Sequence, residues 1–143
     1  MAIRQLSVFL ENRHGTLVEI TELLAKEKID IRAMSLADTQ DFGILRLIVD
    51  NPDAAKASLS EMGFVASVNP VLAVAISDSP GALSEVIRIM AEKCINIEYM
   101  YAFLTTHKDN AYVVLRVADN DGAAGVLAAN GVTIVSEDDI KVL

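Results

Sequence analysis

The spacing of hydrophobic residues changes several times along the chain, and the changes predict alternating strands and helices. Residues 3–10 (IRQLSVFL) are apolar and partly alternating, which is typical of a strand. Between residues 17 and 24 the apolar positions recur on one helical face. The expected elements that follow are strands at 29–37 and 43–50, a short helix that begins at Pro52 and ends at Gly63, and a strand at 64–68.

The same series of elements occurs twice. Residues 17–34 (LVEITELLAKEKIDIRAM) align without a gap on residues 83–100 (LSEVIRIMAEKCINIEYM), and Gly15 aligns with Gly81 at the same offset. Further along, 45–55 aligns on 114–124, and 62–67 on 130–135. The sequence therefore predicts two copies of a βαββαβ unit, at residues 1–69 and 70–143. Because each unit is too small to bury a large core alone, we expect the two to pack on each other.

The order βαββαβ predicts a ferredoxin-like sandwich in each unit, with four antiparallel strands and two helices on one face. Residues 71–77 (VLAVAIS) are expected to begin the second unit, after the fourth strand of the first. The final residues, 140–143 (IKVL), are expected to form a strand that pairs back onto the sheet of the first unit.

Composition narrows the classes of function. A formal net charge of −8 argues against binding a nucleic-acid backbone, which needs clustered Lys and Arg. No apolar run is long enough to cross a bilayer, and no secretory leader is evident at the N-terminus. The single Cys94 cannot form an internal disulfide, which fits a reducing, cytoplasmic location, and we interpret it as a semi-buried core thiol.

The loops ENRHGTL (11–17) and SDSPGAL (77–83) separate the first strand of each copy from its helix. Their glycines lie where the backbone must turn sharply, and we expect packing to leave no room for a Cβ atom. The free N–H groups of the first helical turn favour a carboxylate. Asn12 offers a donor and an acceptor, whereas Asp78 offers acceptors only and suits an ammonium group. A free amino acid needs both kinds of partner, although Asn or Asp here is often a turn or capping residue.

These residues carry a resemblance to a known family. DSPGAL (78–83) followed by INI (95–97) resembles the ACT domain, and ENRHGTL followed by IDI (29–31) matches with His14 in place of the usual proline. The chain resembles a stand-alone tandem ACT protein without a catalytic domain. This implies an α+β fold of two ferredoxin-like units, side by side in a continuous antiparallel sheet with helices on one face. It also implies an effector amino acid at the interface of the two units.

The first loop resembles that of the serine-sensing ACT unit of phosphoglycerate dehydrogenase, which implies ligand contacts from Asn12 and Asn96. The family's histidine before the loop is replaced by Leu10, and this departure argues against serine as the ligand. The pseudo-twofold site would use Asp78 and Asp30, whose two carboxylates suit an ammonium group better than a carboxylate. The predicted ligand-contact residues are Asn12, Arg13, His14, Gly15, Thr16 and Leu17, then Asp30, then Asp78, Ser79, Pro80, Gly81 and Ala82, and finally Asn96.

Catalysis is not expected, because the sequence lacks metal-ligand spacing and a phosphate-binding loop, and we expect no cofactor and no metal. His107 is expected to be exposed in a hairpin, and residues 137–139 (EDD) to form a solvated acidic turn. His14 is either a pH-sensitive ligand contact or a solvated residue. The sequence thus predicts a regulatory sensor of a free amino acid, acting on a second copy or on a partner enzyme.

The alternative is a protein-interaction module that acts through its sheet surface without a small-molecule ligand. Tyr99, Tyr101 and Phe103 share one face of a strand, which either packs on the helices or remains open to a partner.

Overall fold

The computed structural model describes residues 2–11, 13–38 and 41–143. Its contacts divide the chain into two compact units. The N-terminal unit comprises residues 4–69, and the C-terminal unit comprises residues 70–143 together with the start of the chain through Ile3.

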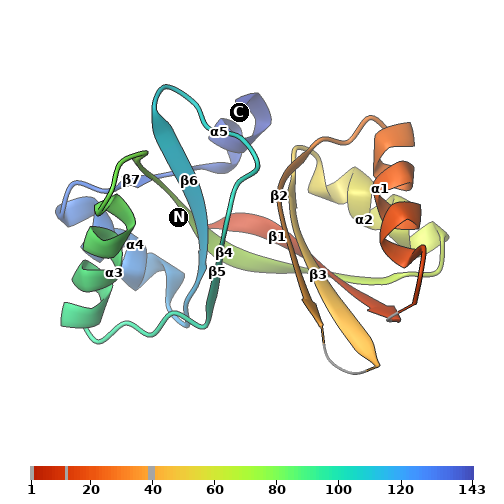
Figure 1. The fold of residues 1–143 in the computed structure, drawn as a ribbon, viewed down its shortest axis with the longest axis horizontal. Coiled ribbons are helices and arrows are strands. Elements are labelled where there is room, and N and C mark those ends of the chain that lie inside the picture. Colours follow the sequence, from red (N-terminus) through yellow and green to blue (C-terminus); the bar gives the residue numbers. More distant parts are fainter. Residues whose placement is uncertain (1, 12, 39–40) are drawn as a thin grey trace. The chain divides into compact units, whose positions relative to one another are not determined.

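In the N-terminal unit the strands follow the order β2-β3-β1-β4, and α1 and α2 lie on one face of this sheet (Figure 1). All described neighbours for which the register is defined are antiparallel, with Leu6 of β1 opposite Leu47 of β3. The elements are β1 (Ile3–Glu11), α1 (Thr16–Lys26), β2 (Ile31–Asp38), β3 (Phe42–Val49), α2 (Pro52–Glu61) and the first part of β4 (Val65–Ser77).

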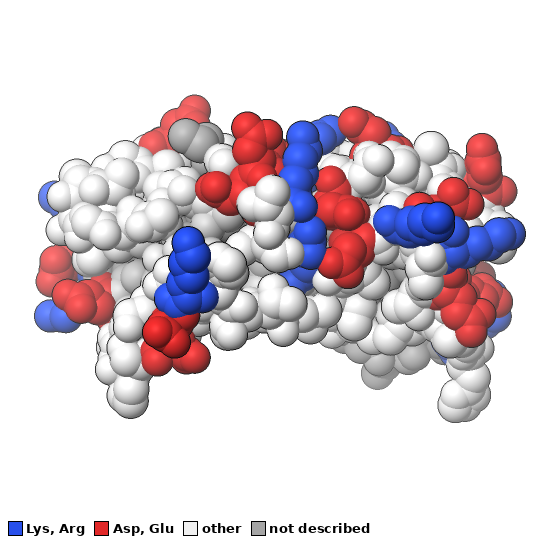
Figure 2. Space-filling view, turned by 90° about the horizontal axis from the view of Figure 1, so that it is seen from above, with Lys and Arg blue, Asp and Glu red and all other residues white. Residues whose placement is uncertain are grey.

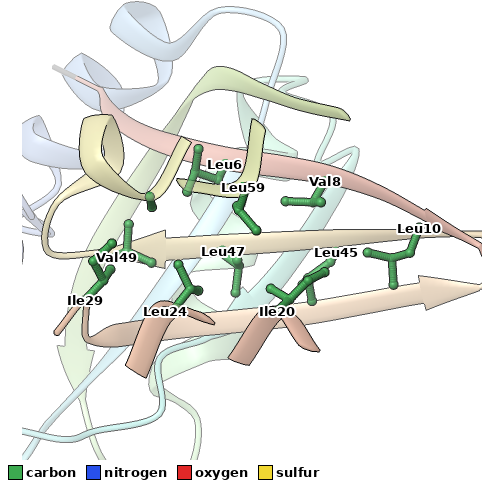
Figure 3. Close-up of a cluster of buried hydrophobic side chains, with 11 residues drawn as sticks. Leu6, Val8, Leu10, Ile20, Leu24, Ile29, Leu45, Leu47, Val49 and Leu59 are labelled. Atoms are coloured by element: carbon green, nitrogen blue, oxygen red, sulfur yellow. The ribbon is translucent and has the colours of Figure 1, made fainter. Parts of the chain in front are cut away.

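The core of this unit follows directly from the sequence periods. Alternate residues of β1 and β3 point toward the helices, and α1 and α2 supply Ile20, Leu24 and Leu59 in return (Figure 3). All three helical side chains are fully buried. The buried cluster consists of Leu6, Val8, Leu10, Ile20, Leu24, Ile29, Leu45, Leu47, Val49, Ala55 and Leu59.

The C-terminal unit repeats the arrangement with the strand order β5-β6-β4-β7, and α3 and α4 share one face of its sheet (Figure 1). Its buried cluster includes Leu72, Val86, Met90, Leu115 and Leu127. The elements are the second part of β4, α3 (Ala82–Glu92), β5 (Tyr99–Ala102), β6 (Asn110–Arg116), α4 (Asn120–Ala129), β7 (Thr133–Ile134) and α5 (Glu137–Val142).

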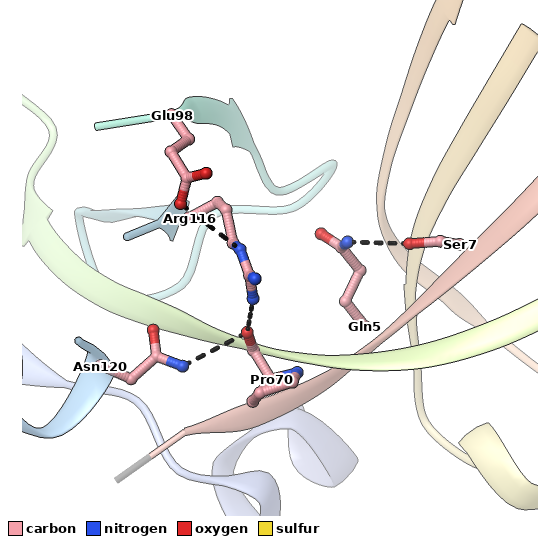
Figure 4. A network of polar contacts seen from close by, with 6 residues as sticks. All are labelled: Gln5, Ser7, Pro70, Glu98, Arg116 and Asn120. Atoms are coloured by element: carbon pink, nitrogen blue, oxygen red, sulfur yellow. Dashed lines mark hydrogen bonds and ion pairs between the residues drawn. The ribbon is translucent and has the colours of Figure 1, made fainter. Parts of the chain in front are cut away.

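Polar side chains bind backbone or each other within each unit (Figure 4). In the C-terminal unit Arg116 donates to the carbonyl oxygen of Pro70 at 2.7 Å and lies 3.7 Å from the carboxylate of Glu98. In the N-terminal unit the buried Gln5 donates to Ser7 at 3.1 Å, and Ser7 donates to Asn69 at 2.7 Å. These bonds provide partners for groups that would be costly to bury alone.

The expected α+β architecture of two βαββαβ units in antiparallel strand pairing is confirmed, with three corrections. Residues 64–68 and 71–77 do not form separate strands, because β4 runs without a break from Val65 to Ser77. The strand therefore serves as the last strand of one unit and the first of the next. The strand passes through Pro70, which cannot donate a backbone hydrogen bond, and a strand tolerates proline where that bond is not needed.

The second correction concerns the alignment of 45–55 on 114–124, which is wrong by one residue. Leu47 is opposite Leu6, and Leu115 is opposite Leu72, so Leu115 occupies the position of Leu47. The helices agree, because Asn51 caps α2 and Asp119 caps α4. The alignment of β3 on β6 is therefore set by which side chains are buried, not by the identity of individual residues.

The third correction concerns residues 140–143, which do not pair as a strand. Ile140 lies in α5, whose N-terminus has a capping box between Ser136 and Asp139. The Ser136 hydroxyl accepts from the backbone N–H of Asp139 at 3.2 Å, and the Asp139 carboxylate accepts from the backbone N–H of Ser136 at 2.9 Å. The spacing of SEDD, residues 136–139, was the sequence signal for this helix, and the expected acidic turn is its first turn.

The aromatic residues of β5 lie on the face opposite α3 and α4. Met100 packs on the core, so Tyr99 and Tyr101 point the other way, with ring centroids 6.4 Å apart. Phe103 contacts Tyr112 at 5.8 Å on that same face. These side chains therefore do not pack on the helices. Phe103 and Tyr112 are nevertheless buried, and Tyr99 and Tyr101 are partly buried, so a surface open to a partner stays a prediction.

Cys94 is exposed, so its interpretation as a semi-buried core thiol is wrong. It follows α3 with a φ of 57°, and this left-handed turn places its side chain outside the core. His107 is exposed, as expected.

Charges of both signs lie side by side on the face seen from above (Figure 2). On the surface shown in Figure 2, Lys and Arg side chains lie beside Asp and Glu side chains. None of the helices in the described part of the chain combines the length and the apolar character that crossing a membrane requires.

Candidate functional site

The two loops after the first strand of each copy have the same backbone geometry. Gly15 has φ 86° and ψ −12°, and Gly81 has φ 89° and ψ −13°, so both are left-handed. Each is the N-cap of its helix and supplies no side-chain cap. A Cβ atom at either position would meet nothing within 4 Å, so the expected lack of room is wrong. Glycine is needed here for its positive φ alone.

A pocket of about 370 Å³ lies beside the N-terminus of α1, within the N-terminal unit. Glu11, Arg13 and Thr16 of the loop line it, together with Glu19 in the first turn of the helix. Its volume is at the lower end of the range for small-molecule sites, which suits a single small metabolite.

Thr16 is the polar group of this pocket that lacks a partner. Its residue is 3% exposed, and its Oγ1 has no hydrogen-bond partner among the described residues. A buried hydroxyl without a partner costs about 1–3 kcal/mol, so such groups are rare in folded proteins. Threonine in a helix divides between two χ1 rotamers, so a rotation can present the hydroxyl to a bound molecule.

The charged groups of the pocket are loosely paired. The Arg13 guanidinium lies 3.6 Å from the Glu11 carboxylate and 3.9 Å from that of Glu19. All three side chains are about half exposed or more, and exposed ion pairs of this kind contribute about 0–1 kcal/mol. Either carboxylate, or the guanidinium, can therefore exchange its partner for a ligand group at little cost.

The opposite wall is apolar and comes from distant parts of the chain. Met62, Gly63 and Phe64 contribute it, and Phe9, Phe42 and Val65 border it from the sheet face away from α1. Phe9, Phe42 and Val65 are exposed by 51%, 60% and 67%, which is unusual for such large apolar side chains. Phe9, Phe42, Met62 and Val65 were not predicted from the sequence, because only the packed sheet and helices bring them to this loop. Glu11 and Glu19 were not predicted either, although both lie within a few residues of Arg13 and Thr16 in the chain.

The C-terminal unit has the same pocket with different side chains. It measures about 270 Å³ and lies beside the N-terminus of α3. Ala82 occupies the place of Thr16, and Ser77 that of Glu11, while Glu85 matches Glu19. On the opposite wall Asn130 occupies the place of Met62.

The remaining predicted residues of the first loop have different environments. Asn12 lies outside the described residues. His14 is exposed, and Leu17 packs on the core of its unit. In the second loop Asp78, Ser79 and Pro80 are exposed. The Ser79 hydroxyl is 2.9 Å from that of Ser77, and Asp78 is not the helix cap, since Gly81 holds that position.

Asn96 and Asp30 each follow the first helix of their unit, at the opposite end from the glycine loop. Asn96 is exposed and lines a pocket of about 670 Å³ together with Cys94. The Asp30 carboxylate accepts a hydrogen bond from the Arg32 guanidinium at 2.5 Å. The backbone N–H of Asp30 donates to the carboxylate of Asp50 at 3.0 Å. The residues predicted to share a site, Asn12 with Asn96 and Asp78 with Asp30, therefore belong to different units.

Comparisons with known proteins place the chain in a family. A model of the ACT domain pair matches residues 1–143. Protein BT0572 from Bacteroides thetaiotaomicron is 38% identical, with a TM-score of 0.92 over 100% of this chain and 98% of that one. The comparison with curated proteins gave no match.

More distant structures share the fold. The ligand-free regulatory subunit of aspartate kinase from Thermus thermophilus is 15% identical, with a TM-score of 0.62 over 88% of this chain and 90% of that one. Aspartate kinase from Synechocystis is 21% identical, with a TM-score of 0.60 over 95% of this chain and 27% of that one. With the family model matching along its whole length, the chain belongs to the ACT domain pair family.

Proposed function

We propose that this protein is a non-catalytic regulator that binds a free amino acid beside the glycine loop of its N-terminal unit. Membership of the ACT domain pair family and the likeness to a regulatory subunit support a regulatory role. The observation that carries the proposal is the pocket at the uncapped start of α1, where groups of both charges meet a buried hydroxyl.

The pocket offers a partner for each end of a zwitterion. The first-turn N–H groups of α1 and the Arg13 guanidinium suit the ligand carboxylate. The Glu11 and Glu19 carboxylates suit the ammonium group. The Arg13 guanidinium lies 3.6 Å from the Glu11 carboxylate and 3.9 Å from the Glu19 carboxylate. A bound amino acid would therefore replace these weak ion pairs with shorter contacts.

The roles of Asn12 and Asn96 in orienting the ligand at the interface of the two units stay predictions. So does an ammonium site formed by Asp78 and Asp30. The ion pair between Asp30 and Arg32 makes Asp30 a weaker candidate for binding an ammonium group, because the ligand has to compete with a guanidinium 2.5 Å from the carboxylate.

A regulator acts by binding one assembly or conformation better than another. We propose that the bound amino acid changes the affinity of this protein for a second copy or for a partner enzyme. Among the described residues no group of three His, Cys, Asp or Glu side chains could hold a metal ion. The proposed mechanism requires none, because recognition uses hydrogen bonds and ion pairs alone.

The test is thermal unfolding of the purified protein with each of the twenty amino acids in turn at millimolar concentration. A ligand at 100 times its dissociation constant stabilises the fold by about 2.7 kcal/mol, which raises the midpoint by several degrees. Arg13→Ala should weaken the response, whereas Arg88→Ala, which removes a 4.0 Å pair with Glu85 on α3, should not. If no amino acid shifts the midpoint, the proposed ligand class is wrong.

The second candidate, a protein-interaction module, is favoured by one observation. Phe9, Phe42 and Val65 are exposed on the face of the N-terminal sheet opposite α1 and α2. A partner protein that covers these side chains would bury apolar surface without any small ligand. Substitution of Phe42 by Ser would then weaken association while leaving every amino acid without effect.

A further inference from the structure

The two pockets beside the glycine loops are one structural feature built twice, and their differences allow the ligand to be specified further. Both lie between the first turn of a helix and the loop that precedes the last strand of the unit, at Gly63 and Gly131. Neither needs residues from the other unit. What each pocket binds is therefore decided by the side chains of its own unit.

The hydroxyl of Thr16 distinguishes the N-terminal pocket. It is buried and has no partner among the described residues, whereas the C-terminal pocket has the methyl group of Ala82 at that position. A hydroxyl at the first position of α1 lies beside the free N–H groups of the first turn, so it adds one donor to a carboxylate site. The C-terminal pocket cannot supply this bond.

The charges differ in the same direction. The N-terminal pocket contains Glu11, Arg13 and Glu19, which give it a cation and two anions for a zwitterion. In the C-terminal pocket Ser77 replaces Glu11, and Ser79, which replaces Arg13, is bonded to Ser77. Glu85 remains there as an acid without a nearby cation from the loop.

The apolar wall specifies the side chain of the ligand. Phe9, Phe42, Met62 and Val65 border the N-terminal pocket, and all four are more than half exposed. A ligand with an apolar side chain removes this surface from water, whereas a charged side chain would lose hydration there without gaining a partner. In the C-terminal pocket Ala75 and Asn130 replace Phe9 and Met62.

Resting on the proposed function, we infer that the N-terminal pocket selects an amino acid with a medium-sized apolar side chain and that one molecule binds per chain. The ligand carboxylate lies at the first turn of α1 with the Thr16 hydroxyl and Arg13. The ammonium group lies between Glu11 and Glu19. The side chain packs on Met62 and Phe64. The pocket beside Gly81 stays without a ligand.

The experiment is isothermal titration of the full chain with leucine, methionine, valine and phenylalanine, and with serine, aspartate and lysine for comparison. The expected result is binding of one or more of the apolar group at one per chain, with the other three at least tenfold weaker. Binding of serine, aspartate or lysine in preference overturns this inference and leaves the proposed function in place. Two equal sites per chain also overturn it. Absence of binding by all four apolar amino acids, while another amino acid raises the unfolding midpoint, overturns this inference alone. Absence of any response to all twenty overturns both.

Matched variants test the assignment to this pocket. Thr16→Val keeps the shape and removes the hydroxyl, and it should weaken binding about tenfold, since a bond to a charged group is lost. Thr16→Ser should restore most of the affinity. Thr21→Val removes a hydroxyl of the same helix that donates to the Leu17 carbonyl oxygen at 3.2 Å, and it should leave affinity unchanged. Unchanged affinity in Thr16→Val would overturn the role of the hydroxyl.

The acid in the first helical turn offers a second matched pair. Glu19→Gln should weaken binding severalfold, because a charged partner of the ammonium group becomes neutral. Glu85→Gln makes the same change in the C-terminal pocket and should have no effect. Equal loss in both variants would show that both pockets bind, which contradicts the inference.

Discussion

The N-terminal and C-terminal units share a backbone and differ in the chemistry attached to it. Gly15 and Gly81 have nearly the same φ and ψ, and the backbone N–H of Glu19 and that of Glu85 each donate to the glycine carbonyl oxygen at 3.0 Å. Beside these equal turns, Thr16 faces one pocket and Ala82 the other. The comparison teaches that the repeated motif specifies a turn, whereas the side chains around it specify whether anything binds.

The largest expected effect tests whether the two cores are equally important. Leu47 and Leu115 occupy matching positions on β3 and β6, and both are fully buried. Substitution of either by Ala should lower the free energy of unfolding by about 2–5 kcal/mol, since it removes apolar contacts and leaves a cavity. Urea denaturation followed by circular dichroism measures this.

Leu104→Ala serves as the control for the core variants, because Leu104 is largely exposed and its loss should cost little. A loss below 1 kcal/mol at either buried leucine would contradict the view that each unit depends on its own core.

The next largest effect concerns the turns. Gly15→Ala and Gly81→Ala should each lower stability by about 1–2 kcal/mol, because an alanine with positive φ is strained. The two losses should be equal, since both sites are open to a Cβ atom and only the backbone matters. Urea denaturation would refute this reason if one variant were neutral and the other strongly destabilised.

The helix caps offer a comparison of smaller effect. The Asn51 side chain accepts from the backbone N–H of Ala54 at 3.2 Å, and that of Asp119 accepts from Gly122 at 3.0 Å. Replacement of either by Ala should cost about 1 kcal/mol through the loss of this bond. The midpoint of thermal unfolding measures both variants, and Lys56→Ala, at an exposed position of α2, is a control that leaves the cap in place.

The smallest effect is expected at the position where the units differ most. Without ligand, Thr16→Val should raise the free energy of unfolding by about 1 kcal/mol, because a buried hydroxyl without a partner is replaced by a methyl group. Thermal unfolding in amino-acid-free buffer measures the change. A clear destabilisation would mean that the hydroxyl has a partner in the free protein, and its proposed role in binding would lose its basis.

Much of the fold was predictable because its signals are local. The apolar face of residues 17–24 predicts α1, and Ile20 and Leu24 are indeed fully buried. The end of the chain was not predicted, although Ser136 and Asp139 have the spacing of a capping box. The strand at residues 140–143 was predicted because the corresponding residues of the first copy begin a strand. The local capping-box spacing indicated a helix instead, and the structure has a helix.

The candidate site was predictable only in part. The glycine loops were predicted to contact the ligand, and Arg13 and Thr16 of the first loop do line a pocket. Leu17, by contrast, packs on the core, because its position in the first turn of α1 directs it inward. The roles of Asn12 and Asn96 stay predictions, because Asn12 lies outside the described residues and Asn96 lines a different pocket.

By itself the sequence determined the repeat, most of the order of helices and strands, and the sharp turns at Gly15 and Gly81, since these depend on residues within a few positions of each other. Tertiary structure decided the rest. The continuity of β4 through Pro70 and the one-residue shift between β3 and β6 follow from which side chains are buried. The pocket depends on Phe42 and Met62, which are far from Thr16 in the chain and meet it only when the sheet and helices pack. A binding surface made from such distant residues is a property of the packed unit, because no local pattern records which side chains will become neighbours.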